Sequence, residues 1–279
     1  MNGFKSFLLI TGMTALLVAL GNHFFGQQGL IIAVGVGLVM NGFSYFFSDR
    51  IVLAMYRARI VDQSEAPELY AIVANLAQRA GLPMPRLAIV PDETPNAFAT
   101  GRNPEHAVVA VTEGIMRTLN RQELEGVLAH ELGHVKHRDI LIGSLASVLA
   151  QAIMLLSRMA FYFSPRDDEG RSNPIAGILV AVLGPLAAML LQMAISRSRE
   201  YMADEFAAHV TGRPDMLASA LQRISGYNAQ VPMRDAEPAT AHMMIVNPLN
   251  GGGLMSLFST HPPIAKRIER LNAMPVQAR

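Results

Sequence analysis

Four apolar stretches without charged residues dominate the pattern of hydrophobic and polar positions along this chain. They cover Ser6–Gln28, Gly29–Ser48, Ile140–Ser157 and Asn173–Ser196. A helix needs about 20 apolar residues to cross the hydrocarbon core of a bilayer, which is roughly 30 Å thick, and each stretch approaches or reaches that length. The pattern therefore predicts two pairs of transmembrane helices, each followed by a polar segment.

Each pair leaves an alternative open. The first stretch follows Lys5 at the N-terminus and could be a signal peptide. Its long apolar core, the lack of a clean small-x-small cleavage site and the second stretch that follows at once favour a retained anchor. In the second pair, Arg158 ends the third stretch early and Pro185 lies inside the fourth. A buried apolar hairpin within a soluble domain is the alternative there.

Positive charges predict how these helices are oriented. Residues 49–139 hold ten Lys and Arg and residues 197–279 hold nine, whereas the loop between the first two stretches holds none. Lys and Arg are enriched in the cytoplasmic segments that flank membrane helices. We therefore expect the N-terminus and both polar segments in the cytoplasm. There the two segments can form one domain, interrupted by the membrane pairs at residues 1–48 and 140–196.

The first polar segment has the pattern of a small sheet with a helix. Apolar residues at helical spacing predict a helix over Pro67–Ala80, and Gly81 follows at the position where a helix ends. Short extended runs at Arg86–Pro91, Ala97–Thr100 and Ala107–Thr112 are separated by Pro, Asn and Gly. These runs predict a small β-sheet.

Further local patterns predict two more helices and one flexible region. Asn120 and Glu123 have the spacing of a capping box, so a helix should begin there and continue for several turns. The run Pro263–Leu271 has the amphipathic pattern of a short helix. Residues Gly226–Gly253 are rich in Pro, Gly and Asn, and we expect them to be flexible.

Composition supports a membrane protein and restricts its chemistry. Only 16% of the residues are charged, against about 25% in soluble globular proteins, and the mean hydropathy is +0.28. A net charge of +1 gives no reason to expect a nucleic-acid partner. The chain contains no cysteine, which fits a reducing compartment, so any metal must be held by His, Asp or Glu.

Residues 130–134 read His-Glu-Leu-Gly-His, an HExxH motif inside the helix that Asn120 opens. Positions four apart lie on one helical face, so His130 and His134 can bind one metal ion, and this spacing is typical of zinc. Glu131 projects from the adjoining face, where it can accept a proton from water. A solvated helix with two incidental histidines is the alternative, and the same ligands would also accept Co²⁺ or Mn²⁺.

A tetrahedral catalytic zinc site needs a third protein ligand. His137 follows His134 by three residues, too close along one helix for unstrained binding, so we expect it on the surface or behind the ligands. A metzincin would have Gly at 137 and His at 140, whereas this chain has His137 and Ile140. The third ligand should therefore come from a distant part of the chain.

Glu200 and Asp204 are the candidates for that distant position. They lie four residues apart on one predicted helical face, directly after the fourth apolar stretch. Glu200 can bind the metal while Asp204 accepts the free N–H of a ligating histidine, a bond that fixes the orientation of the ring. An ordinary acidic helix face is the alternative, and from spacing alone Glu205 would serve equally well.

Four sequence motifs together carry a family resemblance. HELGHVKHRD at 130–139 and SRSREYMADEFA at 196–207 are separated by two apolar stretches and preceded by two more. PNAFATG at 95–101 and THPPIAKRI at 260–268 complete the set. In these features the chain closely resembles the HtpX-type membrane proteases, gluzincin metallopeptidases that are related to the CaaX prenyl endopeptidases. The resemblance covers most of the chain and shows no departure at a catalytic position.

The resemblance implies a mainly α fold: multi-pass membrane helices with a cytoplasmic zincin-like metallopeptidase domain that contains a small β-sheet. It implies one Zn²⁺ per chain held by His130, His134 and Glu200, with Glu131 as the base and Asp204 behind a ligand. Such an enzyme hydrolyses misfolded or damaged membrane proteins at the cytoplasmic face of the bacterial inner membrane. The partners that it implies are those substrates, the lipid bilayer, and other membrane proteases or chaperones.

Two of the motifs have supporting roles by the same resemblance. PNAFATG corresponds to an edge strand that binds an extended substrate through main-chain hydrogen bonds, and its residues here are Asn96, Ala97, Phe98 and Ala99. His261 in the THPP sequence, or Arg267 nearby, would stabilise the tetrahedral oxyanion. The alternatives are a plain surface strand and a structural cap on the C-terminal helix.

Three rival functions stay open at this point. An intramembrane metalloprotease would carry HExxH inside a spanning helix, but the charged residues around His130 are costly in hydrocarbon. A non-catalytic membrane scaffold or chaperone could retain a metal site, although Glu131 is intact. A transporter would need a polar path, and the apolar stretches carry no charged residue at mid-depth.

Overall fold

The computed structural model describes most of the two polar segments. The described residues are 42–43, 45–148, 197–230, 243–246 and 262–276, together with residues 11, 27, 31 and 35. Most of the four apolar stretches lies outside these residues, so the predicted spans and their orientation stay predictions. Within the described ranges, no helix has both the length and the apolar character needed to cross a bilayer. The described chain is mainly helical with one small sheet, as predicted.

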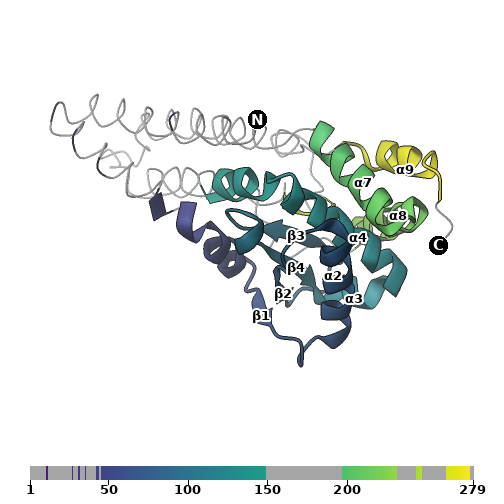
Figure 1. Ribbon diagram of the computed structural model, residues 1–279, viewed down its shortest axis with the longest axis horizontal. Coiled ribbons are helices and arrows are strands. Elements are labelled where there is room, and N and C mark those ends of the chain that lie inside the picture. Colours follow the sequence, from purple (N-terminus) through teal and green to yellow (C-terminus); the bar gives the residue numbers. More distant parts are fainter. Residues whose placement is uncertain are drawn as a thin grey trace, which may run out of the picture.

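A four-stranded mixed sheet forms one layer of the fold (Figure 1). Its strands are β1 (Arg59–Val61), β2 (Arg86–Val90), β3 (Ala97–Thr100) and β4 (Val108–Thr112). Their order is β1-β2-β4-β3, with β2 and β4 parallel and the other neighbours antiparallel. The three predicted runs are confirmed, and the short β1 was not predicted. β3 is an edge strand, which bears on substrate binding below.

Helices bury both faces of this sheet. In β4, Val109 and Val111 face the larger core, which also contains side chains of α2 and α4. Val108 and Ala110 face a second core with the helical residues 45–55. A strand that is buried on both faces reads as a continuous apolar run rather than an alternating one, and this explains the sequence of β4.

The labelled helices lie on one side of the sheet. They are α2 (Pro67–Ala80), α3 (Glu113–Thr118), α4 (Arg121–Lys136), α7 (Arg197–Thr211), α8 (Pro214–Gln230) and α9 (Ile264–Asn272), and Pro104–His106 form the 3-10 turn η1. α2 has the predicted bounds and ends at Gly81, whose φ of +62° favours glycine. α9 confirms the predicted C-terminal helix within one residue at each end.

α8 corrects the prediction of a flexible region that begins at Gly226. Residues 226–230 form the last turn of this helix instead. Ile224 and Asn228 lie on its buried face, and α8 packs against α4 and α9. Tertiary packing therefore outweighs the low helix propensity of Gly and Asn at this position.

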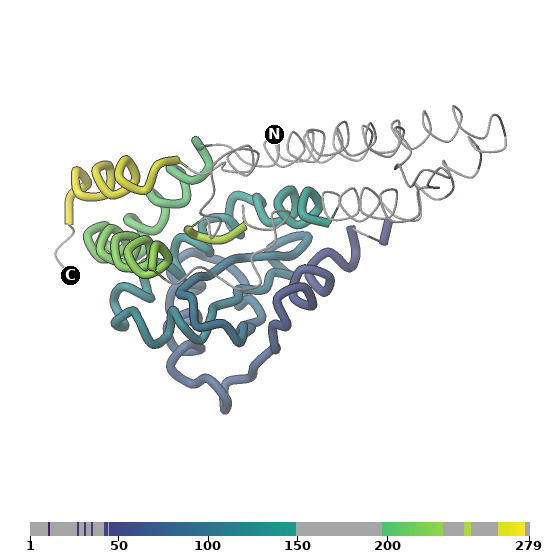
Figure 2. The backbone as a smooth tube through the Cα atoms, turned by 180° about the vertical axis from the view of Figure 1, so that it is seen from behind, coloured from purple at the N-terminus to yellow at the C-terminus, as the bar shows by residue number. Residues whose placement is uncertain are grey.

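α4 is the central helix of the domain. It contacts β3 and α2 as well as α7 and α8, and α7 to α9 lie beyond it as seen from the sheet (Figures 1 and 2). Its first turn is fixed by the predicted capping box. The side chain of Asn120 accepts a hydrogen bond from the N–H of Glu123, and Glu123 accepts one from the N–H of Asn120, both at 3.0 Å. The start of α4 determines which of its residues face α7.

Candidate metal centre

α4 and α7 bring together three of the predicted residues. His130 and His134 lie one turn apart on α4, and Glu200 lies in the first turn of α7. One potential ligand atom from each of the three residues lies within 4.8 Å of the other two. The structure therefore assembles residues that are far apart in the sequence into one group that could hold a metal ion.

The separations within this group fit a zinc ion. The two histidine Nε2 atoms are 3.2 Å apart. Oxygens of Glu200 lie 3.5 Å from Nε2 of His134 and 3.8 Å from Nε2 of His130. Ligand atoms bound at about 2.0–2.1 Å to a tetrahedral zinc ion are about 3.3 Å from one another. The observed distances lie on both sides of that value, so the three residues need only small shifts to bind zinc.

Glycine at position 133 allows α7 to approach α4. A Cβ atom at Gly133 would lie 3.1 Å from Cα of Ala203 and 3.2 Å from Cδ1 of Phe206. A side chain there would push α7, and Glu200 with it, away from the histidines. No role was predicted for Gly133. The available signal was its position inside a capped helix, where glycine costs about 1 kcal/mol relative to alanine and so indicates a packing constraint.

His130 is held from behind by Asp204 and Arg267. Nδ1 of His130 lies 2.9 Å from Oδ1 of Asp204, so Nδ1–H donates to the carboxylate and Nε2 faces the other two ligands. Arg267 of α9 donates to both oxygens of Asp204, at 2.7 and 2.9 Å, and to the carbonyl of Ile245 at 3.1 Å. Its guanidinium is therefore engaged by Asp204, and it also lies 3.4 Å from an oxygen of Glu200 and 3.3 Å from Nδ1 of His130. His261, the other residue expected at the oxyanion, lies outside the described residues.

His134 also has a carboxylate partner, and this one was not predicted. Nδ1 of His134 lies 3.3 Å from Oδ2 of Asp139, and NH1 of Arg199 lies 3.5 Å from Oδ1 of the same side chain. Asp139 faces back toward the helix because Arg138 has a left-handed backbone conformation, with φ of +58°. Asp139 lies beyond the end of α4, so helical spacing gave no indication of where its side chain would point.

In the absence of a metal, the two histidines have very different pKa values. Burial, assisted by the positive charge of Arg267, lowers the pKa of His130 to about 4. Burial also disfavours charge on His134, but the hydrogen bond to Asp139 and the negative charges of Glu200 and Glu131 outweigh it and raise the pKa of His134 to about 9. At neutral pH His130 is therefore neutral, and a proton occupies His134 where a metal would otherwise bind.

Glu131 and His137 are the other two candidate residues on or next to α4. Glu131 is buried on α4, next in sequence to His130. His137 is the C-cap residue of α4, and its ring packs against Phe206 with 5.8 Å between the ring centroids. Within the described part of the chain, the group that could hold a metal does not include His137. That His137 is not a ligand stays a prediction.

The outer edge of β3 is partly occupied by the chain itself. The main-chain N–H of Ile245 donates to the carbonyl of Ala97 at 3.0 Å. The side-chain amide of Asn96 donates to the carbonyl of Val246 at 2.8 Å and accepts from its N–H at 3.4 Å. No contact of residues 243–246 with this edge was predicted, because the region was expected to be flexible. The contact restricts where a substrate can pair with β3.

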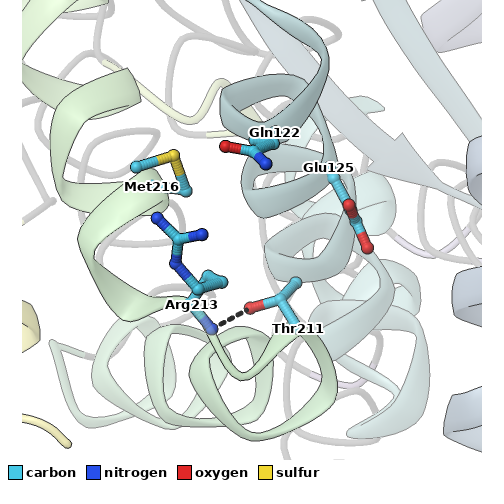
Figure 3. Close-up of a pocket in the computed structure, with 5 residues that line it drawn as sticks. All are labelled: Gln122, Glu125, Thr211, Arg213 and Met216. Atoms are coloured by element: carbon cyan, nitrogen blue, oxygen red, sulfur yellow. Dashed lines mark hydrogen bonds between the residues drawn. The ribbon is translucent and has the colours of Figure 1, made fainter. Parts of the chain in front are cut away.

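A separate pocket lies near the N-terminal end of α4 (Figure 3). Gln122 and Glu125 of α4 face Thr211, Arg213 and Met216 at the connection between α7 and α8. The N–H of Arg213 donates to the hydroxyl of Thr211 at 3.1 Å. The pocket measures about 90 Å³, well below the roughly 300–1,000 Å³ of typical small-molecule sites. It is too small for a peptide, so the histidine group is the better candidate for the chemistry.

Comparisons with known proteins identify the family of this chain. The model of peptidase family M48 matches residues 63–275. The protease HtpX homolog of Paraburkholderia phytofirmans is 53% identical over 276 residues, which cover 98% of this chain and 97% of that protein. The protease HtpX homolog of Thermococcus sibiricus is 55% identical over 271 residues, covering 95% and 93% of the two chains.

One solved structure extends the likeness to the fold. The crystal structure of S. mikatae Ste24p has a TM-score of 0.54 to this chain at 19% sequence identity, and the match covers 97% of this chain. It covers 65% of the Ste24p chain, so this chain spans just under two thirds of that protein. The resemblance to HtpX-type proteases is confirmed, and the chain belongs to peptidase family M48 and is a metalloprotease.

Proposed function

We propose that this chain is a membrane-anchored zinc endopeptidase in which His130, His134 and Glu200 bind the metal and Glu131 is the catalytic base. The observation that carries the proposal is the pair of Nε2 atoms 3.2 Å apart with Glu200 facing both. Each Nδ1 atom is turned to a carboxylate, so both Nε2 atoms direct lone pairs at the same point. A metal ion that replaces the proton of His134 could bind both nitrogens there.

The residues around this point have complementary roles in peptide hydrolysis. A zinc ion held there acts as a Lewis acid toward water and toward a peptide carbonyl. Glu131 accepts a proton from the attacking water and delivers it to the nitrogen of the leaving amine, so no covalent bond to the protein is needed. Since Asp204 engages the guanidinium of Arg267, we assign stabilisation of the oxyanion to His261.

The substrate would bind in an extended conformation along the outer edge of β3. The N–H of Thr112 in β4 donates to the carbonyl of Asn96, and main-chain groups alternate in direction along a strand. The main-chain N–H and C=O groups of Ala97 and Ala99 therefore point to the outer edge. The N–H of Ile245 already donates to the carbonyl of Ala97. We place the substrate's main-chain hydrogen bonds at Ala99. Main-chain pairing accepts many sequences, which suits a protease of low specificity.

The natural substrates that we propose are misfolded or damaged membrane proteins, cleaved at the cytoplasmic face of the bacterial inner membrane. The four apolar stretches and the Lys- and Arg-rich polar segments support this location. The likeness to protease HtpX homologs supports a protease that works at a membrane. Other membrane proteases or chaperones are the partners that we expect at that site.

Cleavage of casein by the detergent-purified full chain tests the enzyme. The assay compares zinc, a chelator, and the variant Glu131→Gln. We expect zinc-dependent cleavage that the chelator abolishes and that Glu131→Gln lowers by about 10²–10⁴-fold, with one zinc per chain retained. Glu125→Gln is the matched control, because Glu125 lies on the same helix and pairs with Arg79 at 3.7 Å instead.

Two results would contradict this proposal in different ways. Normal cleavage by Glu131→Gln would end the assignment of Glu131 as the base while leaving a protease. No cleavage by any form, with zinc bound and the fold intact, would favour a non-catalytic membrane scaffold that retains a metal site.

A further inference from the structure

Asp139 and Arg199 form an ion pair between the two segments that carry the proposed metal ligands. Asp139 follows α4, and Arg199 lies in the first turn of α7, next to Glu200. NH1 of Arg199 is 3.5 Å from Oδ1 of Asp139. Arg199 is 9% exposed and Asp139 is 8% exposed. A buried carboxylate is costly unless a counter-charge and hydrogen bonds compensate it, which indicates a specific role for this pair.

The second oxygen of Asp139 faces a histidine. Oδ2 lies 3.3 Å from Nδ1 of His134. The left-handed backbone of Arg138 separates α4 from the helical residues that begin at 139, and this conformation is uncommon for a residue with a side chain. Asp139 therefore contacts the arginine with one oxygen and the histidine with the other.

We propose that Asp139 is a positioning residue for His134 and that Arg199 holds Asp139 in place. This inference rests on the proposed role of His134 as a metal ligand. By accepting Nδ1–H, Asp139 fixes the tautomer in which Nε2 carries the lone pair, and it fixes the direction of the ring. Arg199 compensates the charge of the carboxylate and keeps it from turning away from the ring.

The pair also joins two positions that are distant in the sequence. Asp139 and Arg199 are 60 residues apart, and the stretch 140–196 between them contains the second predicted pair of membrane helices. Any change in the separation of the two ends of that stretch moves Arg199 relative to Asp139, and Asp139 is in direct contact with His134. The metal site is thereby connected to the part of the chain predicted to lie in the membrane.

Zinc affinity of the detergent-purified full chain, measured by competition with a chelator, tests the positioning role of Asp139. Asp139→Asn keeps the shape and an acceptor but removes the charge, whereas Asp139→Ala removes both. We expect about tenfold weaker zinc binding for the first variant and up to about a hundredfold for the second. With Co²⁺ in place of zinc, the visible absorption spectrum should change in both variants, since it reports the geometry of the ligands.

Asp215→Asn is the matched control for these measurements. Asp215 lies in the first turn of α8 and pairs with Arg213 at 2.7 Å on a partly exposed surface. This variant removes the same charge without touching a proposed ligand. Zinc affinity and the Co²⁺ spectrum should therefore stay unchanged.

A double-mutant cycle tests the part played by Arg199. Arg199→Met alone should weaken zinc binding, and Arg199→Lys should restore part of the loss. Added to Asp139→Ala, Arg199→Met should have little further effect, because the carboxylate that it holds is already absent. Unchanged zinc affinity and Co²⁺ spectrum in Asp139→Ala, or fully additive effects in the cycle, would overturn the positioning role. Cleavage of casein by the unmodified chain and its loss in Glu131→Gln would stand in either case, so the two proposals fail separately.

Discussion

Each histidine of the proposed metal centre is supported by two further residues, and we call each set of three an arm. The two arms have the same residue types but different contact distances. Each arm is a histidine, an aspartate and an arginine: the inner arm is His130, Asp204 and Arg267, and the outer arm is His134, Asp139 and Arg199. In the inner arm, the histidine–aspartate distance is 2.9 Å and the aspartate–arginine distance is 2.7 Å. In the outer arm, the same two distances are 3.3 and 3.5 Å. The histidine side chain is 1% exposed in the inner arm and 18% exposed in the outer arm.

The difference in contact distances follows from the position of each arginine in the fold. Arg267 comes from α9 and is fully buried, and it donates to Asp204 and to the main chain of Ile245. Its guanidinium also lies 3.4 Å from an oxygen of Glu200. Arg199 lies at the start of α7, directly after residues predicted to cross the membrane. The comparison predicts that damage to the inner arm appears mainly in the stability of the fold, and that damage to the outer arm appears mainly in metal affinity.

Arg267→Met should have the largest effect on stability. The substitution leaves the carboxylate of Asp204 buried without its cation, and such a loss costs about 3–5 kcal/mol in the free energy of unfolding. Arg199→Met should cost less, because the contacts of the outer arm are longer and its histidine is more exposed. Urea unfolding of both variants in detergent, followed by circular dichroism, measures the difference. Equal losses would remove the distinction between the arms.

The pH dependence of zinc binding distinguishes the two histidines directly. Without a metal, the pKa of His134 is about 9 and that of His130 is about 4. At pH 7, zinc must therefore displace one proton from His134 and none from His130. Affinity should rise by about tenfold per pH unit well below pH 9 and level off above it, which gives a rise of about fiftyfold between pH 7 and pH 9. Calorimetry in buffers of different ionisation enthalpy should detect one proton released per zinc.

The same proton stabilises the metal-free protein. Because folding raises the pKa of His134, its contribution is complete below the ordinary histidine pKa of 6.5 and is lost as the pH rises through about 9. Asp139→Asn should flatten the pH profile of zinc affinity, since it removes one cause of the raised pKa. His106→Asn, at an exposed position, should leave the profile unchanged. Release of no proton would show that the histidines are not separated in this way.

Gly133→Ala should have a smaller effect that reaches both arms. Its Cβ atom would crowd Ala203 and Phe206, and overpacking of this kind costs about 1–3 kcal/mol. α7 would shift, moving Glu200 and weakening zinc binding. Gly226→Ala is the control, because nothing lies within 4 Å of the added atom and alanine favours a helix by up to about 1 kcal/mol. A stabilising Gly133→Ala with unchanged zinc affinity would contradict the close approach.

Features set by neighbouring residues could be predicted from the sequence. The capping box of Asn120 and Glu123, and the end of α2 at Gly81, depend on hydrogen bonds and backbone angles within a few positions. The spacing of His130 and His134 needs only a helix to place both on one face. For the same reason, the bounds of α2 and β3 were predicted correctly.

Features that depend on contacts between distant segments could not be predicted. Nothing near Gly133 in the sequence shows that α7 passes beside it. Asp139 faces His134 because of one left-handed residue outside the helix. Residues 243–246 pair with the edge of β3 in a region whose composition indicated flexibility. Each of these features is set by packing, which local propensity does not determine.

The inner arm also sets an order of events while the chain is being synthesised. A ribosome makes His130 137 residues before Arg267, and Asp204 63 residues before it. Until α9 has emerged, Asp204 has no cation to hold it in the interior, and the inner histidine has no fixed support. The inner arm is therefore complete only after the last of its three residues has been made.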